Sequence, residues 1–224
     1  MPGTLGRVRI ASVNVGMPAP LRRGDASVPS GIVKTPVAGR VRVGRTNLDG
    51  DGQADLRVHG GPGKAVYAYP ARHYAAWARE LGRDDLVPGF FGENLTLEGV
   101  DEDDVLIGDR FRMGTALLEV SQPRIPCFKL GIRVGDPHFL KPFLQSGRSG
   151  FYLRVVEEGE LAAGDAVERV SRGEGGLSVR EAVRLFAGGE DPGALARAAA
   201  APALEDGWRV MLLERADALR RRAR

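Results

Sequence analysis

Short stretches of β-type sequence, each closed by turn-forming residues, fill the first three quarters of the chain. These runs are four to nine residues long, and Gly, Pro, Asp or Asn stands at their ends. Many short strands with frequent turn signals are typical of β-barrels and β-sandwiches. We predict strands at residues 7–15, 37–43, 65–69, 94–97, 110–113, 116–121, 151–156 and 166–170.

Few helices interrupt this β-type pattern. Within residues 71–81, Tyr74, Trp77 and Leu81 have the spacing of one buried helix face, and Pro70 suits a first helical turn. A shorter helix is expected at 137–144.

The pattern changes to helical after residues 171–176, which have the composition of a linker. Ser178 followed by Glu181 forms a capping box, and helices are expected at 179–186, 192–200 and 206–221. The predicted fold class is therefore mainly β, with a few helices. It consists of a barrel-like β domain at 1–172 and a small three-helix domain at 173–224.

Charge and hydropathy exclude several functional classes. The formal net charge of +3 includes the arginines near the C-terminus, which are better explained as a solvated helix end than as a nucleic-acid arm, so no nucleic-acid partner is expected. No stretch approaches the roughly 20 apolar residues that span a membrane, and the first residues lack a signal-peptide core. We expect a cytoplasmic protein without a membrane partner.

The only cysteine, Cys127, stands among cationic residues. Arg124 and Lys129 lie within six positions of each other around it, and Pro123 and Pro126 keep this segment from forming a regular helix or a central strand. Positive charge near a thiol favours the thiolate, which attacks electrophiles and binds metals. The alternative is a buried structural cysteine, and the sequence leaves the two about equally supported.

A glycine-rich segment at 59–64 is the second candidate. Three glycines in four positions let backbone amides approach an anion, and Lys64 adds a positive charge. The alternative is a tight turn that needs glycine, and the spacing is not that of a P-loop. His59 alone is better explained as a structural histidine than as a metal ligand, because no second histidine or cysteine stands at zinc spacing.

Two more polar side chains lie between turn residues. Asn94 can read the edge of a heterocycle or satisfy its own turn, and Arg148 suits either phosphate recognition or a hairpin. Together with the two segments above, they indicate a thiolate beside a site for a phosphorylated, heterocyclic ligand.

Several long motifs in order give the chain a family resemblance. They are VHGGPGKAVYAYP at 58–70, PGFFGENLTL at 88–97, IGD at 107–109, LEVSQPRIPCFKL at 118–130 and SGRSGFYLRV at 146–155. The chain resembles MOSC-domain proteins, whose domain also forms the C-terminus of molybdenum cofactor sulfurases, and within them the YiiM-like branch with its helical C-terminal domain.

This resemblance implies a molybdenum cofactor (molybdopterin with its metal) bound through Cys127. Cys127 and His59 are the candidate catalytic residues. Cys127 follows from the resemblance, and His59 is our hypothesis for the acid that delivers a proton to the substrate. The residues implied in cofactor binding are Cys127, Arg124, Lys129, Lys64, Asn94, Arg148, Gly60 and Gly61. The implied activity is that of an oxidoreductase which reduces N-hydroxylated compounds, such as hydroxylaminopurine base analogues and amidoximes, to amines and water, and so detoxifies them.

The expected partners follow from that activity. The chain has no dinucleotide-binding fingerprint, so electrons must come from elsewhere, and the resemblance implies a separate flavin-type reductase as their source. A small N-hydroxylated compound is the substrate, and the C-terminal helices are a candidate docking surface or homodimer contact. The alternative function is a carrier, which holds the cofactor or a persulfide sulfur on Cys127 without turnover of its own.

Overall fold

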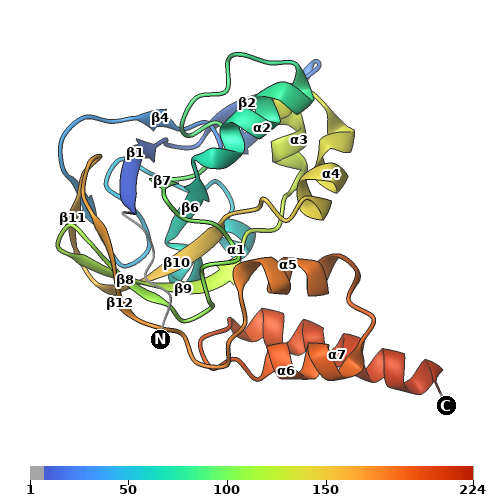
Figure 1. Ribbon diagram of the computed structural model, residues 1–224. Helices are drawn as coiled ribbons and strands as arrows, with labels where there is room; N and C mark the ends of the chain where they lie inside the picture. Colours follow the sequence, from blue (N-terminus) through green and yellow to red (C-terminus); the bar gives the residue numbers. More distant parts are fainter. Residues whose placement is uncertain (1–7, 224) are drawn as a thin grey trace.

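The computed structural model describes residues 8–223, except for the side chains of residues 57 and 58. Its core is one sheet of eight strands in the order β12-β8-β9-β10-β6-β7-β1-β4 (Figure 1). The strands are β1 (Arg9–Val15), β4 (Thr35–Pro36), β6 (Val66–Pro70), β7 (Leu95–Glu98), β8 (Arg110–Met113), β9 (Ala116–Pro123), β10 (Phe151–Glu157) and β12 (Val167–Ser171). The first residue of the predicted strand 7–15, and the start of the chain used to judge a signal peptide, lie outside the described residues.

The sheet curls without closing. Neighbouring strands are antiparallel except for β6 and β7, which are parallel. A bridge between Arg9 and Ala166 brings the start of β12 against β1, while β12 and β4 remain the edges of the sheet. The mainly β prediction is confirmed, but the barrel is not closed, because that bridge is isolated and does not continue as a ladder.

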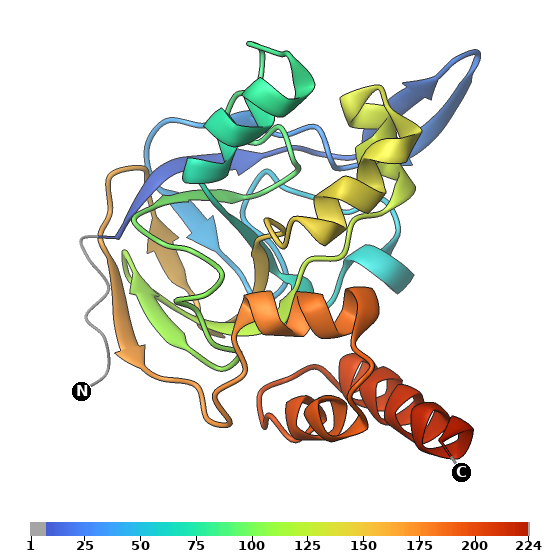
Figure 2. The same cartoon turned by 45° about the vertical axis from the view of Figure 1, so that its right-hand side comes forward.

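Four shorter strands form two small sheets. The hairpin of β2 (Ala19–Arg23) and β3 (Ala26–Ser30) projects away from the body (Figure 2), and β5 (Val41–Val43) pairs with β11 (Gly159–Leu161). The hairpin was not predicted, because Pro20 and Pro29 argue against strands in a single sequence.

The helices form two groups, at different ends of the sheet (Figure 1). The first group is α2 (Arg72–Leu81), α3 (Phe128–Val134) and α4 (Leu140–Gln145), with the short helix η2 (Pro137–Phe139) before α4. The second is α5 (Val179–Gly188), α6 (Pro192–Ala199) and α7 (Asp206–Arg222). Two single turns, α1 (Leu56–His59) and η1 (Pro62–Lys64), precede β6.

Each helix group covers its own apolar cluster. An aromatic cluster under α2, α3 and α4 centres on Trp77, Phe91 and Phe143. The main core runs from the sheet into the C-terminal helices without interruption, and Trp208 and Leu212 of α7 belong to it. The division into domains 1–172 and 173–224 stays a prediction; β12 ends at Ser171 and α5 begins at Val179.

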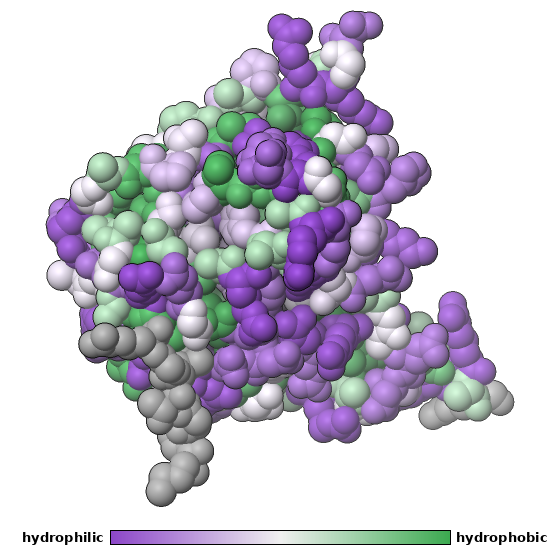
Figure 3. All heavy atoms as spheres, turned by 45° about the horizontal axis from the view of Figure 1, so that its top comes forward, coloured by the Kyte–Doolittle hydropathy of each residue, from purple (hydrophilic) through white to green (hydrophobic). Residues whose placement is uncertain are grey.

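The surface agrees with the mixed charge of the chain. In Figure 3 hydrophilic residues cover much of the visible face, with small hydrophobic areas between them. Among the described residues, no helix combines the length and the hydropathy needed to cross a membrane.

Candidate functional site

One pocket brings together most of the predicted site residues. It holds about 640 Å³ of empty space, open mouth included. Six of the nine predicted site residues line it: Cys127, His59, Arg124, Lys129, Lys64 and Asn94.

The end of β9 and the start of α3 position the cysteine. β9 is buried along its whole length and stops at Pro123, and Cys127 is the residue before the first turn of α3. The backbone N–H of Leu130 donates to the carbonyl of Cys127 at 2.9 Å, which fixes that turn. The irregular segment is thus only four residues long. The prolines end the strand, and a helix that was not predicted begins directly after Cys127.

The surroundings of Cys127 favour its ionised form. Burial of the sulfur opposes ionisation, but a hydrogen bond from His59 and the charge of Arg124 lower the pKa of Cys127 from its usual 9.0 to about 7. His59 is held at the end of α1, where its backbone N–H donates to the carbonyl of Asp55 at 2.8 Å. A partly exposed thiol with this pKa is largely thiolate just above neutral pH, and is therefore a potential nucleophile or metal ligand.

Arg124 is a buried cation with an unused donor. Its guanidinium lies over the rings of Tyr67 and Phe143, at 5.4 and 5.2 Å from their centroids. Its Nη1 atom is buried and has no hydrogen-bond partner among the described residues. Because an unsatisfied buried cation is costly, a guanidinium that lines a pocket in this way is suited to an anionic ligand.

The glycine-rich segment is attached to both β9 and the C-terminal helices. The carbonyl of Gly63 accepts hydrogen bonds from Ser121 Oγ at 2.6 Å and from Gln122 Nε2 at 3.2 Å. A Cβ atom at Gly63 would lie 2.4 Å from the carboxylate of Glu205, so glycine is needed for this close approach. The carboxylate also attracts the ammonium of Lys64, whose pKa is nevertheless lowered, chiefly by burial.

Asn94, the residue before β7, links β1, β6 and the loop of Asp51 behind the pocket. Its Oδ1 accepts the backbone N–H of Tyr67 at 3.0 Å, and its Nδ2 donates to Asp51 Oδ2 at 2.9 Å and to the carbonyl of Asn14 at 3.3 Å. These partners lie 27 to 80 positions away in the sequence, so the side chain of Asn94 joins distant segments and does not satisfy its own turn, and it also borders the pocket.

The same pocket contains a buried ion pair that was not predicted from the sequence. Lys34 and Asp51 form it, and both side chains are almost completely buried. The backbone N–H of Gly16 donates to Asp51 Oδ1 at 3.0 Å. Both residues line the pocket with Cys127. Lys34 follows a short apolar stretch and Asp51 stands between two glycines, so each is typical of an ordinary loop.

Arg148, Gly60 and Gly61 are not among the residues that line this pocket. The guanidinium of Arg148 forms two bonds to the Glu80 carboxylate, at 2.8 and 2.7 Å, and lies 3.7 Å from the centroid of a Trp77 ring. Gly60 and Gly61 connect α1 to η1, and Gly61 has a φ of 92°, which favours glycine. Their predicted role in cofactor binding stays a prediction.

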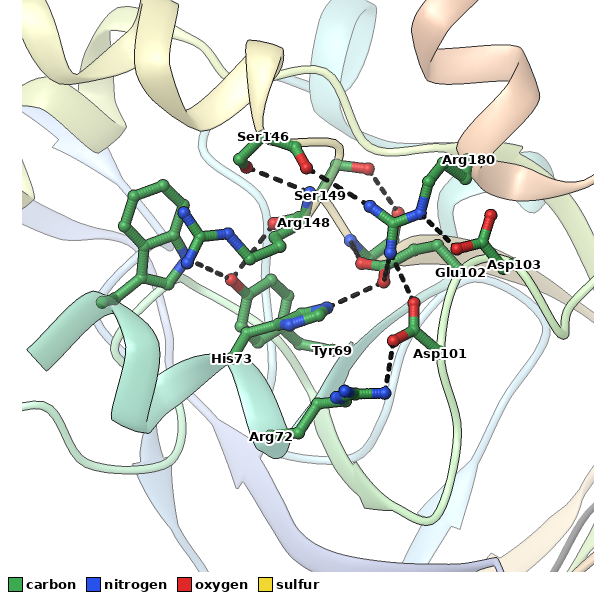
Figure 4. Close-up of polar contacts among 12 residues, drawn as sticks. Tyr69, Arg72, His73, Asp101, Glu102, Asp103, Ser146, Arg148, Ser149 and Arg180 are labelled. Carbon is green, nitrogen blue, oxygen red and sulfur yellow. Dashed lines mark hydrogen bonds and ion pairs between the residues drawn. The ribbon is translucent and has the colours of Figure 1, made fainter. Parts of the chain in front are cut away.

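A buried ion-pair network supports the segment that carries Arg148 (Figure 4). Arg180 reaches from α5 to Asp101 at 2.5 Å and to Asp103 at 2.8 Å. Glu102 is fully buried, contacts His73 Nε2 at 2.7 Å and accepts the backbone N–H of Gly150 at 2.9 Å.

The same network reaches the pocket through the backbone. The carbonyl of Gly150 accepts the backbone N–H of Arg124 at 3.2 Å. The ligand atoms of His73, Asp101 and Glu102 lie within 4.8 Å of one another, but Arg180 and Arg72 bind the carboxylates. The cluster is therefore explained as ion pairing, and it connects a C-terminal helix to the segment behind Arg124.

Comparison with known proteins identifies the family. The model of the MOSC domain matches residues 55–168, which include every predicted site residue. The chain belongs to the MOSC-domain family. A Bacillus subtilis (strain 168) protein, the uncharacterized protein YflK, is 42% identical over 95% of this chain and 96% of its own length. The crystal structure of YiiM from Geobacillus stearothermophilus has a TM-score of 0.78 and 38% identity, over 93% of this chain and 99% of that one. This chain is therefore a YiiM-like MOSC protein.

A longer relative carries an activity in its name. A Gibberella moniliformis (strain M3125 / FGSC 7600) protein named "Reductase" is 36% identical over 76% of this chain, but the match spans only 30% of that protein. MOSC domains form a family that binds the molybdenum cofactor. The pocket fits such a group, because Cys127 offers a thiolate to a soft metal and Arg124 offers a buried, unused donor to an anion.

Proposed function

We propose that this protein is a molybdenum-cofactor-dependent reductase of N-hydroxylated compounds, with Cys127 as the protein ligand of the metal. The observation that carries the proposal is the presence, in one pocket, of the ionisable thiol of Cys127 and the guanidinium of Arg124, whose buried Nη1 has no hydrogen-bond partner in the described part of the chain. Membership of the MOSC family and the relative named as a reductase support it.

The proposed reaction consumes two electrons and two protons. The N–O bond of R–NH–OH breaks, the nitrogen leaves as R–NH₂, and the oxygen leaves as water. When bound, the cofactor supplies a redox-active metal that passes two electrons to the substrate. The protein contributes binding, orientation and protons.

Five residues of the pocket have a role in this proposal. Cys127 binds the metal, and His59 holds the sulfur as a thiolate through its hydrogen bond. Arg124, Lys64 and Lys129 line the same pocket and bind the anionic parts of the cofactor. The predicted role of His59 as a proton donor stays a prediction.

The electron donor is proposed to be a separate flavin-type reductase. The match covers 30% of the relative named as a reductase, so that protein has a large region with no counterpart in the match. We infer that electron delivery needs a component beyond a MOSC domain. Cytoplasmic location and a homodimer through the C-terminal helices remain predictions.

A turnover assay tests the proposal. Protein from a cofactor-producing host is mixed with benzamidoxime and a chemically reduced viologen dye, and benzamidine is measured by chromatography. We expect multiple turnovers for the wild type and none for Cys127→Ser. Stable metal without turnover on benzamidoxime or 6-hydroxylaminopurine would contradict the reductase and support the carrier.

A further inference from the structure

A second reactive group of the pocket is the buried lysine, Lys34. Its side chain is 6% exposed and pairs with the Asp51 carboxylate, which is 1% exposed. It lines the same pocket as Cys127, but it comes from a different part of the chain than the cationic residues around the cysteine. A lysine buried at the wall of a pocket requires an explanation, because burial of its charge is costly.

The ammonium of Lys34 has donors to spare. A lysine ammonium carries three N–H donors, and Asp51 is the hydrogen-bond partner of Lys34 within residues 8–223. Asp51 is in turn fixed by the backbone N–H of Gly16 and by Nδ2 of Asn94, so its carboxylate holds Lys34 in place. The remaining donors of Lys34 are available to a molecule in the pocket.

The position of Lys34 is suited to proton transfer. Burial lowers the pKa of Lys34, while the Asp51 and Glu93 carboxylates oppose that shift. A buried lysine gives up a proton more readily than an exposed one, which is why lysines in pockets act as acids and bases. His59 already donates to the sulfur of Cys127, so Lys34 is better placed to serve the substrate.

We propose that Lys34 is a catalytic residue that binds the oxygen of the substrate N–O group and gives it a proton as the N–O bond breaks. This inference rests on the proposed function. The balance is R–NH–OH plus two protons and two electrons giving R–NH₂ and water, with the electrons supplied by the flavin-type donor. Lys34 supplies one of the two protons and regains it from solvent at the pocket mouth. Asp51 positions the ammonium through its ion pair.

Variants at the ion pair test the role of Lys34. Lys34→Met removes the proton donor but leaves Asp51 buried without its partner, so Lys34→Met/Asp51→Asn is compared with it. Lys34→Arg retains the charge but does not release a proton at neutral pH. Lys141→Met removes an exposed lysine of α4 and serves as the matched control.

Binding and turnover are measured separately on cofactor-loaded protein. Calorimetry with benzamidoxime on oxidised protein, without a reductant, reports binding alone. We expect the double variant to keep wild-type molybdenum content, to bind benzamidoxime about 10-fold more weakly, and to lose about 10²- to 10³-fold in kcat. Lys34→Arg should bind benzamidoxime within about 3-fold of wild type, because the guanidinium replaces the lost hydrogen bond. Its kcat should fall by about 10²- to 10³-fold, as in the double variant, because arginine does not release a proton.

Three other outcomes would overturn the proposed role of Lys34. Wild-type kcat in the loaded double variant or in Lys34→Arg would overturn the proton-donor role. Loss of molybdenum and pterin from the double variant would make Lys34 a cofactor ligand and would also overturn the proposal. An active wild type with active variants refutes only the role of Lys34, whereas a loaded wild type inactive on every N-hydroxylated compound refutes the proposed function and this inference together.

Discussion

Trp208 of α7 donates its indole N–H to Oε1 of Gln122 at 2.9 Å, inside the protein. Gln122 lies at the end of β9, five residues before Cys127, and also donates to Gly63 of the glycine-rich segment. One contact therefore joins the last helix to both segments that form the cysteine side of the pocket.

Trp208→Phe should destabilise the protein, because it removes both the indole N–H and part of a buried ring. It leaves a buried amide oxygen without a donor, which costs about 1–3 kcal/mol in the free energy of unfolding. Urea unfolding measures the change. Adding Gln122→Met removes the unsatisfied oxygen and should recover part of the loss; equal stability of Trp208→Phe and wild type would show that the contact contributes nothing.

The pKa of Cys127 predicts its reactivity in the cofactor-free protein. The rate of alkylation by iodoacetamide should rise with pH, with a midpoint at about pH 7 for the folded protein. For the protein unfolded in urea, the midpoint should lie near pH 9.0. His59→Ala should move the folded midpoint upward, because it removes the hydrogen bond that favours the thiolate. A midpoint near 9.0 in the folded wild type would contradict the described environment.

The sign of the linked stability effect follows from the same pKa. Because folding lowers the pKa of Cys127, the thiolate stabilises the folded state fully above pH 9 and loses this effect as the pH falls through about 7. Cys127→Ser should remove this part of the pH dependence of unfolding, which urea titrations at pH 6 and pH 9 measure.

Replacing Arg124 with methionine and replacing Arg148 with methionine should have different effects on cofactor content and on stability. Arg124→Met should lose most bound cofactor, yet leave the cofactor-free protein as stable as wild type or more so, because an unsatisfied buried donor disappears. Arg148→Met should keep its cofactor and lose up to about 1 kcal/mol, since its partner Glu80 is half exposed. Pterin fluorescence measures the cofactor content, and thermal unfolding measures the stability. Equal loss of cofactor in the two variants would show that Arg148 also binds the cofactor.

Arg180→Met should be severely destabilising. It leaves the fully buried Glu102 without its guanidinium partner, and removing one member of a buried ion pair costs about 3–5 kcal/mol. Arg184→Met on the exposed face of the same helix is the matched control and should change little. If urea unfolding gives the same free energy for both variants, the network does not hold α5 to the rest of the protein.

The strands and helices with strong periodicity could be predicted from the sequence. The helix at 72–81, with Trp77 buried, and the capping box of Ser178, whose side chain accepts the backbone N–H of Glu181 at 3.1 Å, are examples. That the sheet stays open could not be predicted, because it depends on how residues near Arg9 and Ala166, far apart in the chain, pair with each other.

The candidate site was predictable where a polar or charged side chain stands in a short segment with its own pattern, such as basic residues beside the cysteine or glycines beside Lys64. Arg124 and Lys129 flank Cys127 in the sequence and also in the pocket. Lys34 and Asp51 were missed because they lie 17 positions apart in the sequence and come into contact only when their loops fold together. Arg148 stands in a motif shared with the family, but its ion pair with Glu80 depends on the packing of α2, which no local pattern reveals.

Molybdenum content per chain tests the central claim most directly. Wild type and Cys127→Ser are purified from the same cofactor-producing host and compared by elemental analysis, with pterin fluorescence measured on the same samples. We predict close to one molybdenum per wild-type chain and almost none in Cys127→Ser. Equal molybdenum in both proteins, or pterin without metal in the wild type, would contradict Cys127 as the ligand of the metal.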